Sequence, residues 1–188
     1  MLEAFLVSTG LVALGEIGDK TQLLSLILAA RFRRPWPIVA GIFAATLANH
    51  TMAGGLGAWI TSLFGEDTMI KVAGASFLAM AVWALIPDKL DEGEIRRVGG
   101  GVFWTTVVMF FMAEMGDKTQ IATVALAARF HEFFGVVAGT TLGMMIANVP
   151  AILLGDRFAH RLPTKLVHGI AAVLFVVLGA MAVMGVGV

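Results

Sequence analysis

Six stretches of apolar sequence, each long enough to cross a lipid bilayer, constrain the fold of this chain more than any other feature. A helix needs about 20 apolar residues to span the hydrocarbon core. The stretches cover approximately residues 2–30, 37–63, 69–86, 102–128, 133–154 and 166–186. Only 14% of the 188 residues are charged, and a soluble fold of this length would lack the polar surface to cover itself. The sequence therefore predicts an all-α integral membrane protein with six transmembrane helices.

The composition excludes several classes of function. Lys and Arg together number 13, as do Asp and Glu, and the formal net charge is zero. A protein that binds nucleic acid through its charge is therefore excluded. The chain contains no cysteine, which excludes disulfides and thiolate metal sites. No positively charged segment precedes the first apolar stretch, so we expect a retained first helix and not a cleaved signal peptide.

The charged segments between the apolar stretches predict the orientation in the membrane, because cytoplasmic loops carry an excess of Lys and Arg. The loops on one side contain Arg31, Arg33, Arg34, Lys89, Arg96, Arg97, Arg157, Arg161 and Lys165, whereas the opposite loops hold Lys71 and Arg129. We therefore expect both termini outside. Residues 87–101 are predicted to form a charged cytoplasmic linker between a first half, 1–86, and a second half, 102–188.

A seven-residue motif occurs twice in the chain. Glu-Ile-Gly-Asp-Lys-Thr-Gln at residues 16–22 returns 98 residues later as Glu-Met-Gly-Asp-Lys-Thr-Gln at residues 114–120. Each half contains three predicted helices, so the second copy must enter the membrane in the opposite direction. Secondary transporters are commonly built from such inverted repeats, with the substrate site near the membrane midplane between them. The sequence therefore predicts two inverted three-helix repeats.

Both motif copies place charged residues inside predicted spans, where each charge costs roughly 2.5–3.5 kcal/mol at the bilayer centre. These residues should therefore face one another, water or a bound ion. On a continuous helix, the Glu and the Asp of one copy share a face, and the Gln lies three residues further along. Structural Glu–Lys pairs within each helix would leave the aspartates unexplained. The predicted metal ligands are the side-chain oxygens of Glu16, Asp19, Gln22, Glu114, Asp117 and Gln120.

Neutral and basic residues complete the predicted site. Further oxygens come from Thr21, Asn49, Thr119 and Asn148, and this hard-oxygen set suits Ca²⁺, Mn²⁺ or Mg²⁺ better than copper or zinc. Gly18 and Gly116 either loosen the helix at the motif or allow close helix packing. Lys20 and Lys118 are either temporary counter-ions of an empty site or permanent partners of the acids. His50, His160 and His168 are expected to lie outside the site.

Four carboxylates and two lysines give the predicted site a net charge of −2, which one divalent cation would neutralise. Without the metal, several acids crowded in a low dielectric cannot all stay ionised. Metal ion and protons then compete for the same oxygens, which is a physical basis for cation/proton exchange. Glu16 and Glu114 are the expected proton carriers.

The two Glu-x-Gly-Asp-Lys-Thr motifs closely resemble the Glu-x-Gly-Asp-(Lys/Arg)-(Thr/Ser) pattern of a family of cation/proton antiporters. That family includes a eukaryotic Golgi manganese/calcium transporter and bacterial manganese exporters. Both copies match the pattern at every position, and the likeness covers essentially the whole chain. The resemblance implies Mn²⁺ or Ca²⁺ transport coupled to protons, with Glu16, Asp19, Glu114 and Asp117 as cation ligands.

The compact six-helix form resembles the prokaryotic members of this family. This likeness implies manganese export from the cytoplasm across the plasma membrane, with no resident cofactor and no enzymatic activity. Two alternatives are a passive divalent-cation channel lined by the acids and an intramembrane metal-dependent lipid-phosphate hydrolase. The near identity of the motif copies favours a transporter over the hydrolase, and the two lysines among the acids favour an occluded site over an open pore.

Overall fold

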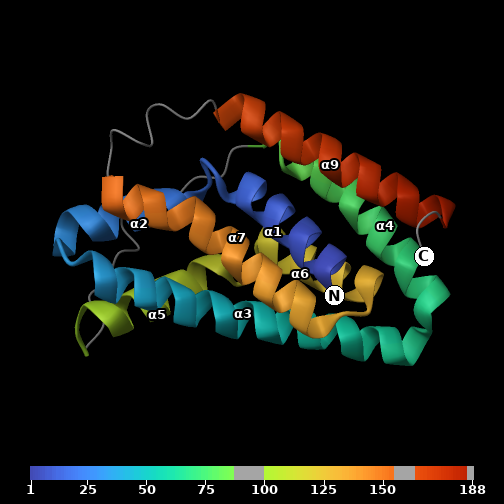
Figure 1. The fold of residues 1–188 in the computed structure, drawn as a ribbon, viewed down its shortest axis with the longest axis horizontal. Coiled ribbons are helices and arrows are strands. Elements are labelled where there is room, and N and C mark those ends of the chain that lie inside the picture. Colours follow the sequence, from blue (N-terminus) through green and yellow to red (C-terminus); the bar gives the residue numbers. More distant parts are fainter. Residues whose placement is uncertain (87–99, 155–163, 186–188) are drawn as a thin grey trace.

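The computed structural model describes residues 1–86, 100–154 and 164–185. These residues form helices and contain no strand. In chain order the helices are α1 (Leu2–Glu16), α2 (Lys20–Phe32), α3 (Pro35–Phe64), α4 (Glu66–Trp83), α5 (Gly101–Glu114), α6 (Lys118–Phe130), α7 (Phe133–Leu154) and α9 (Thr164–Met184). The prediction of an all-α protein is confirmed, and most helices follow the long direction of the molecule (Figure 1).

The helices follow the six predicted apolar stretches, but two of the stretches contain a break. α1 and α2 divide the first stretch, and α5 and α6 divide the fourth. By length and composition alone, α7 and α9 are the described helices that could cross a membrane, and α5 is a shorter apolar helix. α1 and α2 are each short because of the break, and α4 begins with the charged pair Glu66-Asp67.

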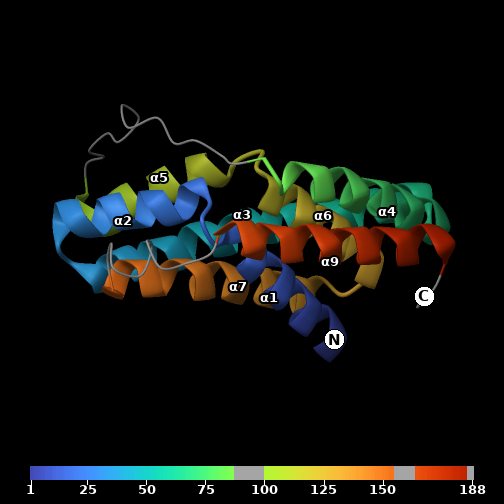
Figure 2. The same cartoon turned by 90° about the horizontal axis from the view of Figure 1, so that it is seen from above.

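Two long helices, α3 and α7, lie side by side, and the other helices pack around them (Figures 1 and 2). α1 packs along α7, while α5 and α6 pack along α3. The chain runs through α1 and α2 in the direction opposite to its course through α5 and α6 (Figure 1). α4 and α9 form a pair that packs on α1 and α6, toward the end of the bundle away from α2 and α5 (Figure 2).

Equivalent glycines allow two of the close helix contacts. A Cβ on Gly41 of α3 would lie 2.7 Å from the Cβ of Thr106 on α5. A Cβ on Gly139 of α7, 98 residues later, would lie 2.5 Å from the Phe5 carbonyl oxygen on α1. Small residues let helix backbones approach closely, as in membrane helix pairs. The repeat therefore extends from each motif into the long helix that follows it.

The described surface is largely apolar, and much of the polar chemistry lies inside. Large apolar side chains are exposed on several helices, among them Trp36, Phe64, Val82, Phe134 and Val173. The four carboxylates of the motifs, several threonines and both asparagines are buried. This distribution is the reverse of the one that water favours.

Two groups of sequence predictions fall outside the described residues. The predicted linker, except its last two residues, is one of them, and Arg157, His160 and Arg161 form the other. The orientation inferred from the loop charges therefore stays a prediction.

Candidate metal centre

The first motif copy breaks the helix between α1 and α2. α1 ends at Glu16, and α2 begins at Lys20 with Asp19 as its N-cap. Gly18 has a φ of +84°, a left-handed conformation that glycine adopts without steric cost. The continuous helix that would place Glu16 and Asp19 on one face is therefore not formed, because Glu16 ends one helix and Asp19 caps the next.

The second copy breaks its helix in the same way. α5 ends at Glu114, and α6 begins at Lys118 after Asp117, whose Oδ1 accepts a hydrogen bond from the Lys118 backbone N–H at 2.8 Å. Gly116 has a φ of +78°. The residue before each of the two glycines is extended, with ψ of 116° in one copy and 115° in the other. Both glycines open the helix at the motif, and Gly18 also allows close packing, because a Cβ there would lie 2.6 Å from Thr164 Cγ2.

The motif glutamines hold the two breaks in shape. Gly18 N–H donates to Gln22 Oε1 at 3.0 Å, and Gly116 N–H donates to Gln120 Oε1 at 2.7 Å. Gln22 also donates from Nε2 to the Ala147 carbonyl on α7 at 2.9 Å. The amide oxygens thus bind backbone N–H groups that the interrupted helix leaves without a helical partner. Direct coordination of a metal by these oxygens stays a prediction.

Three carboxylates meet between the two breaks. Oxygens of Glu16, Asp19 and Asp117 all lie within 4.8 Å of one another, and the three residues are at most 4% exposed. Glu16 accepts a hydrogen bond from Thr21 Oγ1 at 2.5 Å and a second one from Thr119 Oγ1. Both halves of the chain thus supply one cluster of hard oxygen atoms.

The two motif lysines pair with the aspartates of the opposite half. Lys20 Nζ lies 3.3 Å from Asp117 Oδ2, and Lys118 Nζ lies 3.3 Å from Asp19 Oδ1. The pairs therefore cross between the two breaks, and no pattern within one motif copy would predict them. In this conformation each lysine neutralises an acid that the other half supplies.

Glu114 stands apart from its counterpart Glu16. It is 1% exposed, and neither of its carboxylate oxygens accepts a hydrogen bond from the described residues. It also lies outside the group of three carboxylates, so the convergence of four predicted by helix spacing is incomplete here. A buried polar group without a hydrogen-bond partner is costly. Of the four motif carboxylates, Glu114 is therefore the one that would gain most from a further ligand.

The two asparagines hold neighbouring helices in place. Asn49 on α3 donates to the Phe111 carbonyl at 3.2 Å, one turn before the end of α5. Asn148 on α7 accepts from Ser25 Oγ at 2.6 Å and donates to the Met144 carbonyl at 3.0 Å. Ser25, which lies on α2 one turn after the motif threonine, is not among the residues that the sequence predicts for the site. Each asparagine thus contacts one of the interrupted helices, Asn49 contacting α5 and Asn148 contacting α2.

Two histidines also have notable positions. His168 on α9 lies with Nε2 2.7 Å from the Ile17 carbonyl oxygen at the first break. The sequence does not indicate this contact, because α9 is remote from the motif, and the place of His168 outside the site stays a prediction. His50 on α3 is fully buried, and its ring nitrogens have no hydrogen-bond partner among the described residues.

The helices and the centre together define a class of protein. Two interrupted helices, one from each half, meet at a buried group of carboxylates and lysines. Carboxylate oxygens are the ligands that divalent cations such as Mn²⁺, Ca²⁺ and Mg²⁺ prefer. Ion sites between interrupted helices are typical of secondary transporters. The class is therefore a helical cation transporter.

Comparison with known proteins identifies the family within this class. A family model described as "Divalent cation/proton antiporter GDT1" matches residues 4–92 and 102–186. The chain belongs to this family of divalent cation/proton antiporters, and it is a transporter and not an enzyme. No solved structure matches the chain.

Relatives from bacteria and plants support the assignment. The chain is 49% identical over 179 residues to a protein of Vibrio cholerae named "Putative manganese exporter", with 95% of this chain and 89% of the relative covered. It is 33% identical over 198 residues to "GDT1-like protein sll0615" of Synechocystis sp., covering 93% of this chain and 94% of the relative. "Protein PAM71-homolog, chloroplastic" of Arabidopsis thaliana is 26% identical over 214 residues, with 97% of this chain and 59% of the relative covered.

Proposed function

We propose that the protein exchanges Mn²⁺, Ca²⁺ or both for protons, and that it exports manganese from the cytoplasm. It does so across a prokaryotic plasma membrane, as two inverted three-helix repeats with both termini outside. The observation that carries the proposal is the buried cluster of Glu16, Asp19 and Asp117, to which both halves contribute. The name of the Vibrio cholerae relative supports manganese as the ion.

The distribution of polar and apolar residues supports a membrane location. Large apolar side chains cover the outside, and charged side chains meet in the interior. Interrupted helices with free backbone groups occur inside membranes where protein groups satisfy them, as the motif glutamines do here. The opposite courses of α1–α2 and α5–α6 support the inversion of the repeats (Figure 1).

The charges of the centre support binding of one divalent cation. Glu16, Asp19, Glu114 and Asp117 carry four negative charges, and the two motif lysines leave a net charge of −2. The aspartate oxygens that would bind the ion already lie 3.3 Å from lysine Nζ atoms. An arriving cation must therefore displace the ammonium groups or share these oxygens with them. The same lysine–aspartate pairs stabilise the ion-free centre, because they balance the aspartate charges when no metal is bound.

Protons compete with the metal at the same carboxylates. Several acids within a few ångströms cannot all stay charged in a low dielectric unless a cation balances them. Departure of the metal therefore favours uptake of protons, and its arrival favours their release. Glu16 and Glu114 are the proposed carriers, the first among hydroxyl donors and the second without a hydrogen-bond donor among the described residues.

The exchange can be tested with purified protein in liposomes, where Mn²⁺ movement and internal pH are recorded together under an imposed pH gradient. We expect Mn²⁺ and protons to move in opposite directions. Glu16→Gln and Asp117→Asn should each lower the rate more than about tenfold, a loss that even an outer-shell partner causes at a metal site. A parallel panel of Ca²⁺ and Mg²⁺ gives the ion preference.

Exposed acids provide matched controls for this experiment. Glu3→Gln on α1 and Asp67→Asn on α4 change the same chemical groups outside the centre, and both should transport like the parent. Unchanged rates in Glu16→Gln and Asp117→Asn would remove the site assignment. Mn²⁺ flux without any proton movement would instead favour the passive channel.

A further inference from the structure

α9 contacts the break between α1 and α2 through residues that the motif does not contain. His168 Nε2 lies 2.7 Å from the Ile17 carbonyl oxygen. A carbonyl can only accept, so the imidazole N–H donates this hydrogen bond. Thr164, one turn earlier, lies against the same break, because a Cβ on Gly18 would be 2.6 Å from its Cγ2. A hydrogen bond and close packing thus fasten α9 to the first break.

The second break has no equivalent contact among the described residues, since a Cβ on Gly116 would meet no atom within 4 Å. The last helix of the first half, α4, contains no histidine. The contact with the break is therefore specific to one half.

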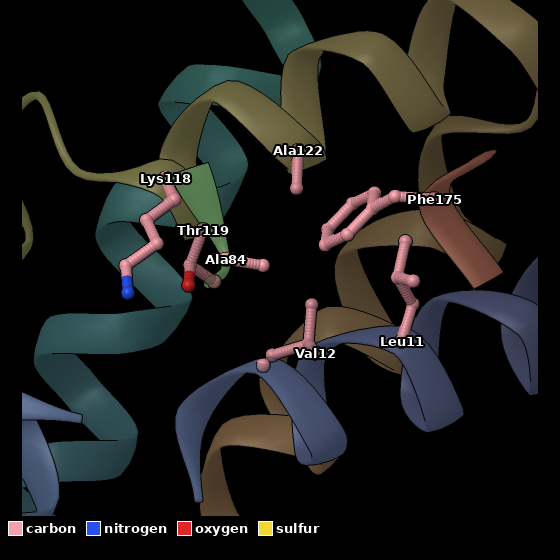
Figure 3. Close-up of a pocket in the computed structure, with 8 residues that line it drawn as sticks. Leu11, Val12, Ala84, Lys118, Thr119, Ala122 and Phe175 are labelled. Carbon is pink, nitrogen blue, oxygen red and sulfur yellow. The ribbon is translucent and has the colours of Figure 1, made fainter. Parts of the chain in front are cut away.

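The same asymmetry exists between whole helices. α9 packs on α1, and α4 packs on α6. The equivalent contacts after exchange of the two halves would join α4 to α5 and α9 to α2, and in the described part of the chain these are sparse or absent. A cavity of about 20 Å³ lies where the pair meets α1 and α6 (Figure 3), which is room for about one water molecule. It is lined by Leu11, Val12, Gly15, Ala84, Lys118, Thr119, Ala122 and Phe175.

The position of this cavity relates the α4–α9 pair to the metal centre. Thr119 and Lys118 line one end of it, and they contact Glu16 and Asp19 respectively. Phe175 of α9 lies at the opposite end (Figure 3). The pair therefore covers the centre on the side of α1 and α6.

We propose that His168 is a positioning residue that holds the α4–α9 pair over the α1–α6 side of the centre, and that its hydrogen bond to Ile17 breaks when the pair moves to uncover that side. The inference rests on the proposed exchange, which requires access to the centre from both sides in turn. In transporters built from inverted repeats, access alternates largely by rigid-body rocking of one repeat or bundle against the other around the fixed site. A contact made by one half alone therefore stabilises one of the two conformations.

The lack of native cysteine permits a direct test. Ala122 lines the cavity and is 2% exposed, so the reaction rate of a single Ala122→Cys with a small thiol reagent reports opening of the α1–α6 side. His168→Leu removes the donor and should raise this rate about three- to tenfold, the population shift expected from one net hydrogen bond. His168→Gln should keep the parent rate, because its amide N–H can reach the position of Nε2.

The equivalent residue of the first half provides the control. Leu24 on α2 is fully buried. In the His168→Leu background, the labelling rate of Leu24→Cys should not rise, because the α4–α9 pair moves toward α2. Equal increases at both cysteines would mean that the variant only loosens the fold. Such equal increases would overturn the proposal. It would also be overturned if His168→Leu left the rate at Ala122→Cys unchanged, or if His168→Gln changed that rate as much as His168→Leu does. Labelling needs no transported ion, so its outcome is independent of whether Mn²⁺ exchanges for protons.

Discussion

Each aspartate of the metal centre depends on a lysine from the other half of the chain. Asp19 pairs with Lys118 and Asp117 pairs with Lys20, and the separation is 3.3 Å in both pairs. A buried charge that loses its partner destabilises a protein strongly. The crossed pairs therefore join the two halves and hold the ion-free centre together.

A double-mutant cycle tests this coupling. Asp19→Asn and Lys118→Met should each lower the free energy of unfolding by about 3–5 kcal/mol, because each removes one member of a buried ion pair. The double variant should lose less than the sum, by about 1–3 kcal/mol, as is usual for residues in contact. Unfolding in detergent measures these changes, with Lys71→Met on the exposed side of α4 as control. Additive losses would contradict the coupling.

The sequence identifies the charged residues of the centre but not their partners. Spacing within a motif gives neighbours on one helix, whereas the pair of Lys118 and Asp19 joins residues 99 positions apart. Glu16 and Glu114 have nearly the same motif neighbours, yet one accepts two hydrogen bonds and the other none from the described residues. Such differences arise from packing of distant helices, which a repeated pattern cannot encode.

At the level of the helices, the breaks at the two motifs position the site. Each break turns two helix ends toward the centre and frees backbone groups, and a glycine at positive φ makes the turn possible. The sequence left open whether these glycines interrupt the helix or serve packing, because glycine is tolerated in both settings. Gly18 does both, since α9 also lies against it, whereas Gly116 has open space around its Cα among the described residues.

The two glycines should therefore respond differently to the same substitution. Gly116→Ala forces an L-residue into a left-handed conformation and should cost about 1–2 kcal/mol of stability. Gly18→Ala carries the same strain and adds a contact of 2.6 Å with Thr164, so its loss of stability should be larger. The midpoints of thermal unfolding in detergent give the comparison. A smaller effect at Gly18 would mean that α9 does not lie against the first break.

On the scale of the whole molecule, the two halves are alike in sequence and local geometry but not in their packing. The all-helical class and the six apolar segments follow from the sequence, because long apolar runs and an internal repeat are strong patterns. The placement of α4 and α9 over α1 and α6 does not follow from it, since equivalent helices could equally cover α2 and α5. A repeat predicts both placements of the α4–α9 pair, over α1 and α6 or over α2 and α5. Tertiary contacts such as the hydrogen bond of His168 to Ile17 favour the first.

The orientation can be tested with single cysteines in the otherwise cysteine-free chain. Asp67→Cys, in the first turn of α4, should react with an impermeant thiol reagent applied to intact cells, because the segment between the second and third predicted spans is expected outside. Asp91→Cys in the charged linker should react only after the cells are opened. The reverse pattern would invert the topology and with it the direction assigned to transport.

The number of Mn²⁺ ions bound by the purified protein, counted by electron paramagnetic resonance, tests most directly whether both halves build one cation site. We expect one ion per chain. Asp19→Asn and Asp117→Asn should each weaken its binding more than about tenfold, because both supply oxygens to the same cluster, while Glu3→Gln should bind like the parent. Two independent ions, each lost with only one of the aspartates, or binding that survives both substitutions would contradict a shared site.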